Sequence, residues 1–550
     1  MKFCSDIYII GGECNFVKRK RCGKKTKNLF FDGYKQGEMC YNGQGFCFFD
    51  ILTGGANMKI GFDHDKYAQL QSEHILKRIN DFGGKLYLEL GGKLFDDNHA
   101  SRVLPGFRPD SKVSMLLKMR DQAELLIIIS ADDIEKSKVR GDLGITYDAD
   151  VLRLIDAFRA IGLYVGSVVL TKFAAQRACI NFQKRLESLG IKVYRHFPIE
   201  GYPYDVQHIV SDDGFGMNEY IETTRPLVLV TAPGPGSGKM AVCLSQLYQE
   251  HKRGVKAGYA KFETFPIWNL PLKHPVNMAY EAATADLSDV NMIDPFHLEA
   301  YGQTTVNYNR DIEIFPVLNA LFKQVMGYSP YKSPTDMGVN MVGNCICDDE
   351  ACREAACQEI IRRYYAARCN LLQGKGSQAE VDKISLLMQQ LDLTDESRRT
   401  IGCARTRASE TGAPALAIEL PTGEIVTGKT SNLLGPSAAA LLNAVKKLGG
   451  MDDALHLISP TVIEPIQSLK CDYLGNNNPR LHTDEVLLAL SICAATDENA
   501  RKAMLQLPRL KECQAHSTVI LPQVDDNVFR RLGVHVTCDP QYQVKKLYHK

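Results

Sequence analysis

A glycine-rich loop followed by a lysine is the segment whose residue types and spacing point most directly to chemistry. Residues 231–239 read TAPGPGSGK; they follow a short apolar run at 227–230 and lead into a predicted helix. A strand, a glycine loop and a helix start, in that order, turn backbone N–H groups toward an anion that the helix N-terminus also attracts. We therefore predict a phosphate site in the 231–240 loop, and its binding residues are Gly234, Gly236, Ser237, Gly238 and Lys239.

This loop departs from the phosphate-loop pattern G-x-x-x-x-G-K-[ST] at two positions. Pro233 stands where the first glycine belongs, and Met240 stands where the magnesium-binding hydroxyl belongs. The missing hydroxyl weakens the case for Mg²⁺ coordination and NTP hydrolysis more than the case for holding an anion. The cofactor is therefore left open, with ATP, with or without Mg²⁺, as a candidate. A turn with an exposed lysine is the alternative interpretation.

Charged residues near a second strand could supply catalytic groups. Asp132 and Asp133 follow the apolar run 123–130, and parallel sheets present ligands from the carboxyl ends of their strands. Arg140 and Asp142 lie in the next segment, 138–148, whose charges and glycines suit a binding loop at the same sheet edge. We predict catalytic roles for these four residues. The start of a helix is the alternative for the aspartate pair.

A long irregular stretch, 266–308, contains two further candidates for acid–base chemistry, Asp294 and His297. Long segments without a regular period are usually functional loops. Neither residue has diagnostic spacing, so a structural hydrogen-bonding role is the alternative for each.

No metal site is predicted. The cysteines at 345, 347, 352, 357 and 369 form no C-x-x-C pair, so we interpret them as thiols of a helical core. Protease signatures such as H-E-x-x-H and G-x-S-x-G do not occur either, which disfavours a protease.

The elements that must position these residues alternate along the chain. Strand-like runs at 85–90, 123–130, 164–171 and 191–197 are separated by helical patterns, which predicts βαβ units and a parallel sheet covered on both faces. We therefore expect an α/β multidomain protein: an α/β domain at 58–317 that includes the phosphate-loop-like segment, a helical domain at 318–400, and an α/β domain at 401–550.

The segment 414–450 resembles the opening of the cytidine-deaminase-like fold. It contains a strand, a tight turn, a second strand, a loop and an alanine-rich helix. Zinc deaminases place a His or Cys ligand and a general-base Glu at that helix start, where this chain has Gly435, Pro436 and Ser437. The resemblance therefore implies the fold without zinc ligands, and zinc-dependent deamination is disfavoured.

Composition limits the classes of binding partner and the cellular location that we expect. The 550 residues carry 65 Lys and Arg against 64 Asp and Glu, so the net charge of +1 favours neither nucleic acid nor an anionic membrane. Because no run of 18 apolar residues and no secretion signal occur, we expect a cytoplasmic protein. Its expected partner is a small phosphorylated or anionic metabolite, and a homo-oligomer is left open. Residues 1–57 are expected to be a poorly ordered leader, or a stretch translated from a misassigned start, rather than a basic arm.

From Met58 to the C-terminus, long sequence motifs resemble the bacterial domain-of-unknown-function family 1846. The motifs are FGGKLYLELGGKLFDDNHASRVLPGF, ADDIEKSKVRGDLGITYD, TAPGPGSGKM and NMIDPFHLEAYG. Because that family is uncharacterised, the resemblance implies membership but no activity. The residues themselves favour an enzyme that binds a nucleotide or phosphorylated metabolite, of ATP-dependent or phosphoryl-transfer type. A non-hydrolysing anion-binding protein and a non-catalytic assembly protein are the alternatives.

Overall fold

The computed structural model describes residues 59–92, 95, 98–140, 143–287 and 289–543, together with the backbone of 40–42 and 45–47. The chain divides into two units, residues 1–54 and 55–550. In the first unit, β1 (Cys40–Asn42) and β2 (Gly45–Cys47) form an antiparallel pair. The prediction of a poorly ordered leader otherwise falls outside the described residues. All that follows concerns the second unit.

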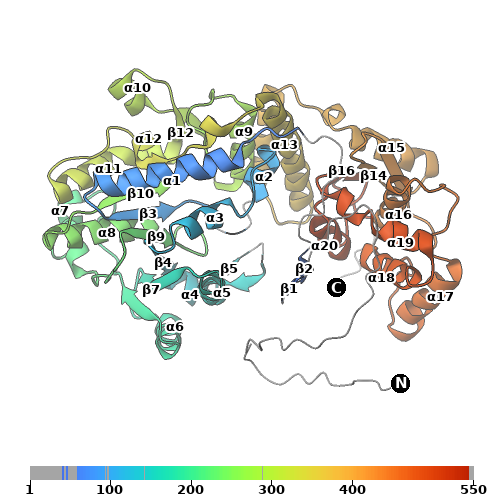
Figure 1. Ribbon diagram of the computed structural model, residues 1–550, viewed down its shortest axis with the longest axis horizontal. Helices are drawn as coiled ribbons and strands as arrows, with labels where there is room; N and C mark the ends of the chain where they lie inside the picture. The colour runs from blue at the N-terminus through green and yellow to red at the C-terminus, as the bar shows by residue number, and fades with distance from the viewer. Residues whose placement is uncertain are drawn as a thin grey trace, which may run out of the picture. The chain divides into compact units, whose positions relative to one another are not determined.

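A seven-stranded, fully parallel sheet forms the centre of the N-terminal half (Figure 1). Its order is β13 (Gly338–Val339), β10 (Gly258–Phe262), β3 (Leu86–Leu90), β9 (Leu227–Thr231), β4 (Ala123–Ser130), β7 (Tyr164–Thr171) and β8 (Lys192–Arg195). All residues of β4 and β9 are buried. This explains why both strands are rich in apolar residues, and the parallel sheet confirms the predicted α/β class.

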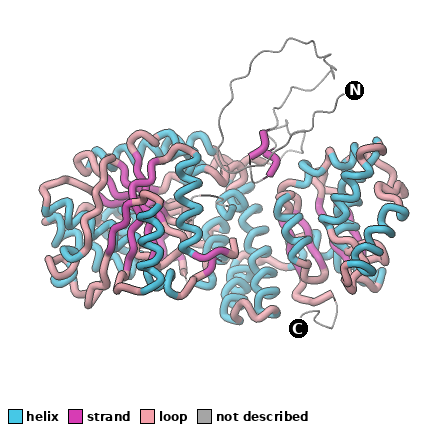
Figure 2. The backbone as a smooth tube through the Cα atoms, turned by 90° about the horizontal axis from the view of Figure 1, so that it is seen from below, coloured by secondary structure: helices cyan, strands magenta, loops and turns pink. Residues whose placement is uncertain are grey.

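Helices cover both faces of this sheet, as Figure 2 shows for the strands between two helical layers. The helices that precede or connect the first four strands are α1 (His64–Asp81), α2 (Asn98–Val103), α3 (Ser111–Lys118), α4 (Ala131–Glu135), α5 (Tyr147–Ala160) and α6 (Arg177–Ser188). After β8 come α7 (Val206–Ile209), α8 (Lys239–Lys252) and α11 (Asn309–Met326). The chain moves from β4 to β8 in one direction and from β9 to β13 in the other. Right-handed crossovers therefore place α5 and α6 on one face and α8 and α11 on the opposite face.

The stretch 266–308 is more regular than expected. It contains α9 (Pro275–Ala283), β11 (Asn291–Ile293), α10 (Pro295–Tyr301) and β12 (Val306–Tyr308), and α12 (Pro334–Met337) follows before β13. Both α9 and α10 begin with a proline and a side-chain cap. Helices of nine and seven residues are too short to show a clear period, which explains why the sequence pattern concealed them.

A helical segment follows the sheet. It consists of α13 (Asp349–Leu372), α14 (Gln378–Gln390) and α15 (Arg399–Thr411). The helices predicted at 351–372 and 378–391 are confirmed. Apolar residues of α13 and α14 share one core with residues of α9, while the sheet has its own core.

The C-terminal part contains a four-stranded sheet in the order β15 (Ile425–Lys429), β14 (Ala415–Glu419), β16 (Gln514–Ser517) and β17 (His535–Cys538). The first two pairings are antiparallel and the last is parallel. Its helices are α16 (Pro436–Leu448), α17 (Pro460–Ser468), α18 (Thr483–Cys493), α19 (Glu498–Met504) and α20 (Gln523–Arg531). A separate hydrophobic core lies among these elements. The exact domain boundaries stay a prediction. Among the described residues, no helix has the length and apolar character to cross a bilayer.

Candidate functional site

The glycine loop connects β9 to α8 at the carboxyl edge of the sheet. Gly236 and Gly238 adopt left-handed φ angles of 73° and 90°, which residues other than glycine rarely adopt. Gly238 is the N-cap of α8, and no side chain caps this end of the helix. The first backbone N–H groups of a 14-residue helix therefore lack a side-chain acceptor, as an anion site requires.

Neighbouring residues hold this loop in place. The Thr171 hydroxyl, at the end of β7, donates a hydrogen bond of 2.6 Å to the backbone oxygen of Ser237. A Cβ on Gly234 would lie 2.3 Å from the Tyr147 hydroxyl, so only glycine fits there. The Ser237 hydroxyl is buried and has no hydrogen-bond partner among the described residues. This leaves one unused polar group inside the loop.

Lys239 is the first residue of α8 and lies over the end of β3. Its Nζ is 3.9 Å from Oε1 of Glu89, and the two side chains are 17% and 14% exposed. Glu89 also accepts a 2.8 Å hydrogen bond from the hydroxyl of Tyr259 on β10. The lysine side chain therefore does not extend into bulk solvent. It lies beside polar groups of β3 and β10, which are neighbours in the sheet.

Three more charged residues adjoin this point. Lys261 Nζ lies 2.7 Å from Oδ1 of Asp311 in the first turn of α11, and 3.9 Å from Oε1 of Glu263. Burial raises the pKa of Glu263 to about 8, and Asp311 and Glu89 add to this effect while Lys261 opposes it. This upward shift favours the protonated form of Glu263 near neutral pH, in which the carboxyl can donate a proton. We call Glu89, Lys239, Tyr259, Lys261, Glu263 and Asp311 the polar cluster.

Sequence reasoning identified Lys239 but missed the other five members of the polar cluster. A signal was available: Glu89 interrupts the apolar strand LYLEL, and Lys261 interrupts GYAKF. A charge inside a strand that is otherwise buried on both faces needs a partner, and the partners here come from distant parts of the sequence.

The predicted aspartate pair begins α4, directly after β4. Asp132 Oδ1 accepts a long, 3.4 Å hydrogen bond from Gln176 Nε2, and Asp133 Oδ1 lies 3.2 Å from Lys138 Nζ. Both side chains are half-buried in the first turn of a five-residue helix. Their predicted catalytic role stays a prediction.

Arg140 lies in a short antiparallel hairpin formed by β5 (Val139–Arg140) and β6 (Ile145–Thr146). Its Nη1 lies 2.7 Å from Oδ2 of the fully buried Asp150, which also accepts from Arg153. This ion pair fastens the hairpin to α5. Asp142 lies outside the described residues.

Asp294 and His297 lie near β13, the strand at one end of the sheet order. Asp294 caps α10 and accepts a 2.6 Å hydrogen bond from the Thr335 hydroxyl, while His297 Nδ1 lies 2.9 Å from the Ser333 hydroxyl. These partners precede β13, four strand spacings from β4, which is about 19 Å. Figure 1 accordingly shows α10 and α4 on opposite sides of the sheet. The structure does not bring these residues to Asp132 or Asp133.

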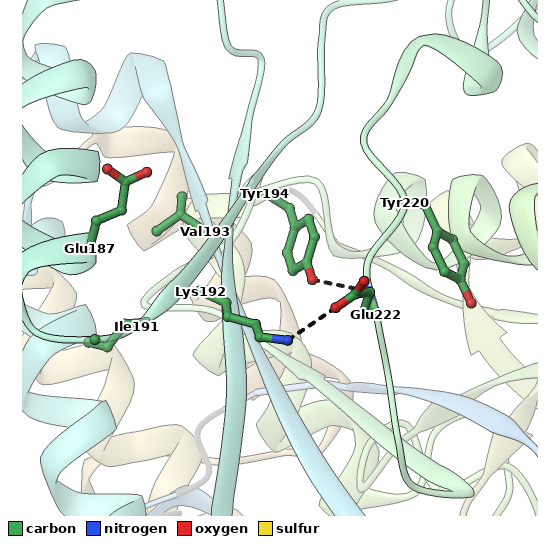
Figure 3. A pocket seen from close by; sticks show the side chains of 8 residues that line it. Glu187, Ile191, Lys192, Val193, Tyr194, Tyr220 and Glu222 are labelled. Atoms are coloured by element: carbon green, nitrogen blue, oxygen red, sulfur yellow. Dashed lines mark hydrogen bonds and ion pairs between the residues drawn. The ribbon is translucent and has the colours of Figure 1, made fainter.

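A surface hollow at the sheet's edge strand offers no comparable chemistry. It is lined by residues of β8 and by Tyr220 and Glu222 (Figure 3). Its one ion pair, Lys192 with Glu222 at 3.1 Å, has side chains more than 60% exposed. Because β8 is three strands from β9, this hollow is also remote from the glycine loop.

Comparison with known proteins agrees with the resemblance seen in the motifs. Residues 60–392 match the family described as "Domain of unknown function DUF1846, N-terminal", and residues 396–548 match its C-terminal counterpart. A UPF0371 protein of Streptococcus thermophilus is 58% identical over 492 residues, which cover 90% of this chain and 100% of the relative. A UPF0371 protein of Corynebacterium diphtheriae is 59% identical, over 89% of this chain and 99% of the relative. The chain belongs to the DUF1846 family.

Proposed function

We propose that this member of the DUF1846 family is a cytoplasmic enzyme that binds a nucleotide or a phosphorylated small metabolite through the 231–240 loop. The observation that carries the proposal is the position of Lys239. It begins a helix whose N-terminus has no side-chain cap, and its Nζ points into the polar cluster rather than away from the protein.

Three features of the loop favour an anionic ligand. The partial positive charge of the α8 N-terminus and the lysine ammonium act on the same point. The Ser237 hydroxyl is available as a further donor because it has no partner among the described residues. These features of the loop and Lys239 support the proposal of a phosphate-loop-like site.

The polar cluster provides the groups for chemistry beside a bound phosphate. Glu263, with its pKa near 8, is suited to general acid–base catalysis at neutral pH. Lys239 and Lys261 are suited to stabilising negative charge on a transferred group. We therefore favour phosphoryl transfer or another ATP-dependent reaction, in which Asp132 and Asp133 remain candidates for contacts at the same sheet edge.

One observation supports the second candidate, a protein that captures an anion without hydrolysing a nucleotide. Met240 occupies the position of the magnesium-binding hydroxyl, and its side chain packs against the hydrophobic core of the sheet. It offers no oxygen to a metal ion. Dependence of ATP binding on Mg²⁺ distinguishes the two candidates.

The C-terminal part is proposed to have a deaminase-like fold without deaminase chemistry. Its strand pairings and the α16 start beside β15 support this likeness. At the helix start, Pro436 and Ser437 stand where zinc deaminases have a metal ligand and a general base.

Calorimetric titration with ATP, ADP and inorganic phosphate, each with and without Mg²⁺, tests the proposal. We expect Lys239→Ala to weaken binding at least about tenfold, because a hydrogen bond to a charged group contributes about 1.5–3 kcal/mol. Lys252→Ala, at the exposed C-terminal end of the same helix, is the matched control and should bind as the wild type does. Equal affinity in both variants would show that the loop is only a turn.

A further inference from the structure

Three arginines converge on a single buried glutamate at the junction of α2 and α13. Glu359 is 2% exposed, and its carboxylate accepts hydrogen bonds from Arg362 at 2.5 and 2.6 Å and from Arg363 at 2.8 Å. Nη1 of Arg102, on α2, lies 3.9 Å from the same carboxylate. His99, one turn before Arg102, approaches it at 3.6 Å. We call Arg102, Arg362 and Arg363 the arginine cluster.

The charges of this cluster do not balance. Three guanidinium groups, which remain protonated in proteins, share one carboxylate, so two positive charges lack a direct partner among the described residues. Asp286, Asp526 and Glu512 act on the cluster only from a distance, because none forms an ion pair with it within 4 Å among the described residues. Unpaired charge in a partly dehydrated position is costly.

Arg102 shows this cost most clearly. Burial, together with the neighbouring Arg362, lowers the pKa of Arg102 to about 10. Its buried Nε atom has no hydrogen-bond partner among the residues that the structure describes. Arg362 and Arg363 donate three hydrogen bonds to Glu359, whereas Arg102 Nη1, at 3.9 Å, is beyond hydrogen-bond distance. The Arg102 guanidinium is therefore poorly placed to be only the counterion of Glu359.

The cluster is nevertheless open to solvent. The side chains of Arg102, Arg362 and Arg363 are 25%, 18% and 30% exposed. The His99 ring, one turn before Arg102 on α2, packs edge-on against Phe265 and Tyr280 at centroid distances of 5.2 and 5.3 Å, which fixes this helix against its neighbours. Guanidinium groups that are fixed, accessible and in excess match the bidentate geometry of a phosphate oxyanion.

We propose that Arg102, Arg362 and Arg363 form a second anion site that binds a phosphate or pyrophosphate group. Its residues come from α2 and α13 and none belongs to the 231–240 loop, so this proposal does not depend on the glycine loop. Glu359 positions two of the arginines, and the bound oxyanion supplies the missing negative charge. Arg102 makes its main interaction with the ligand rather than with the protein.

Thermal unfolding of the full chain in the Lys239→Ala background tests the second site without a contribution from the glycine loop. Inorganic phosphate and pyrophosphate are added at constant ionic strength. We expect both anions to raise Tm as their concentration rises, and Arg102→Gln to weaken the apparent affinity at least tenfold. Arg353→Gln, an exposed arginine of α13 that pairs with Asp349, is the control and should leave the affinity unchanged.

The ligand-free variants separate a binding role from a structural one. If Arg102 serves the ligand, Arg102→Gln relieves repulsion and its Tm without anion equals or exceeds that of the parent protein. A lower Tm, with no response of either protein to phosphate, would show that Arg102 only stabilises Glu359 and would overturn the proposal. Equal protection by citrate, which has carboxylates and no phosphate, would overturn the assignment to phosphate.

Discussion

Helices α8 and α16 begin in similar ways but leave different surroundings at their N-termini. Both follow a glycine N-cap, Gly238 and Gly435, and neither start has a side-chain cap. The first turn of α8, residues 239–241, is half-buried, whereas residues 436–438 of α16 are buried. A Cβ on Gly428 of β15 would lie 2.1 Å from the backbone nitrogen of Ala440, so α16 is pressed directly against its strand.

The contrast shows which property makes a helix start a candidate site. The unoccupied N–H groups of a helix N-terminus are common to both, but only α8 leaves its first turn accessible. The adjoining strands also differ, because β3 and β10 bring Glu89, Tyr259 and Lys261 toward Lys239. At α16 the same local pattern is used for close packing.

Gly428→Ala should have the largest effect, because it disturbs the close packing of α16 on β15. The new methyl group would meet the Ala440 backbone, which cannot move without displacing α16, so we expect a loss of about 3 kcal/mol in the free energy of unfolding. Urea denaturation measures it. Gly402→Ala in α15, where a Cβ meets nothing within 4 Å, should be neutral or slightly stabilising. A Gly428→Ala protein as stable as the wild type would contradict the close packing of α16.

The polar cluster should be visible in the pH dependence of stability. Because the pKa of Glu263 is raised to about 8 from an ordinary 4.5, the folded protein holds a proton that the unfolded chain releases between these values. Stability contributed by this proton is therefore present at low pH and is lost as pH rises toward 8. The slope is at most about 1.4 kcal/mol per pH unit for one proton.

Glu263→Gln removes this titration. Relative to the wild type, the variant should gain about 2 kcal/mol between pH 6 and pH 8, measured by urea denaturation at each pH. The exposed Glu187→Gln serves as the control. Parallel stability profiles of wild type and Glu263→Gln would mean that Glu263 is ionised in the folded protein at neutral pH.

A smaller loss of stability is expected from removing the hydroxyl of a threonine that bonds to the backbone near each helix start. Thr171→Val removes the hydrogen bond to the Ser237 backbone oxygen and should cost about 1 kcal/mol, with a several-fold weaker affinity for phosphate. Thr430→Val, which removes the bond to the Pro414 oxygen before α16, should cost a similar amount without changing phosphate affinity. Calorimetry measures the phosphate affinity of the two variants, and urea denaturation measures their free energy of unfolding. An unchanged phosphate affinity in Thr171→Val would show that the loop conformation does not matter for ligand binding.

Much of the secondary structure was predictable because it depends on neighbouring residues. The strands at 123–130 and 164–171 were placed to the residue, since buried parallel strands consist mainly of apolar residues. The helices of 266–308 were missed because α9 and α10 are too short for a period to emerge. For Asp132 and Asp133 the sequence allowed two interpretations, a helix start and a catalytic site. The structure places both residues in the first turn of α4, and their catalytic role stays a prediction.

Sequence alone is enough to identify the α/β class, the glycine loop, the lysine that follows it and the family. Those features reside in contiguous segments, where backbone preference and hydrophobic pattern act locally. Only the tertiary structure decided that Glu89, Glu263 and Asp311 surround the lysines of the polar cluster, and that Arg102 reaches the Glu359 carboxylate. The physical reason is that Coulomb interactions and burial depend on distances in space, and strand order and helix packing set those distances between residues far apart in the chain.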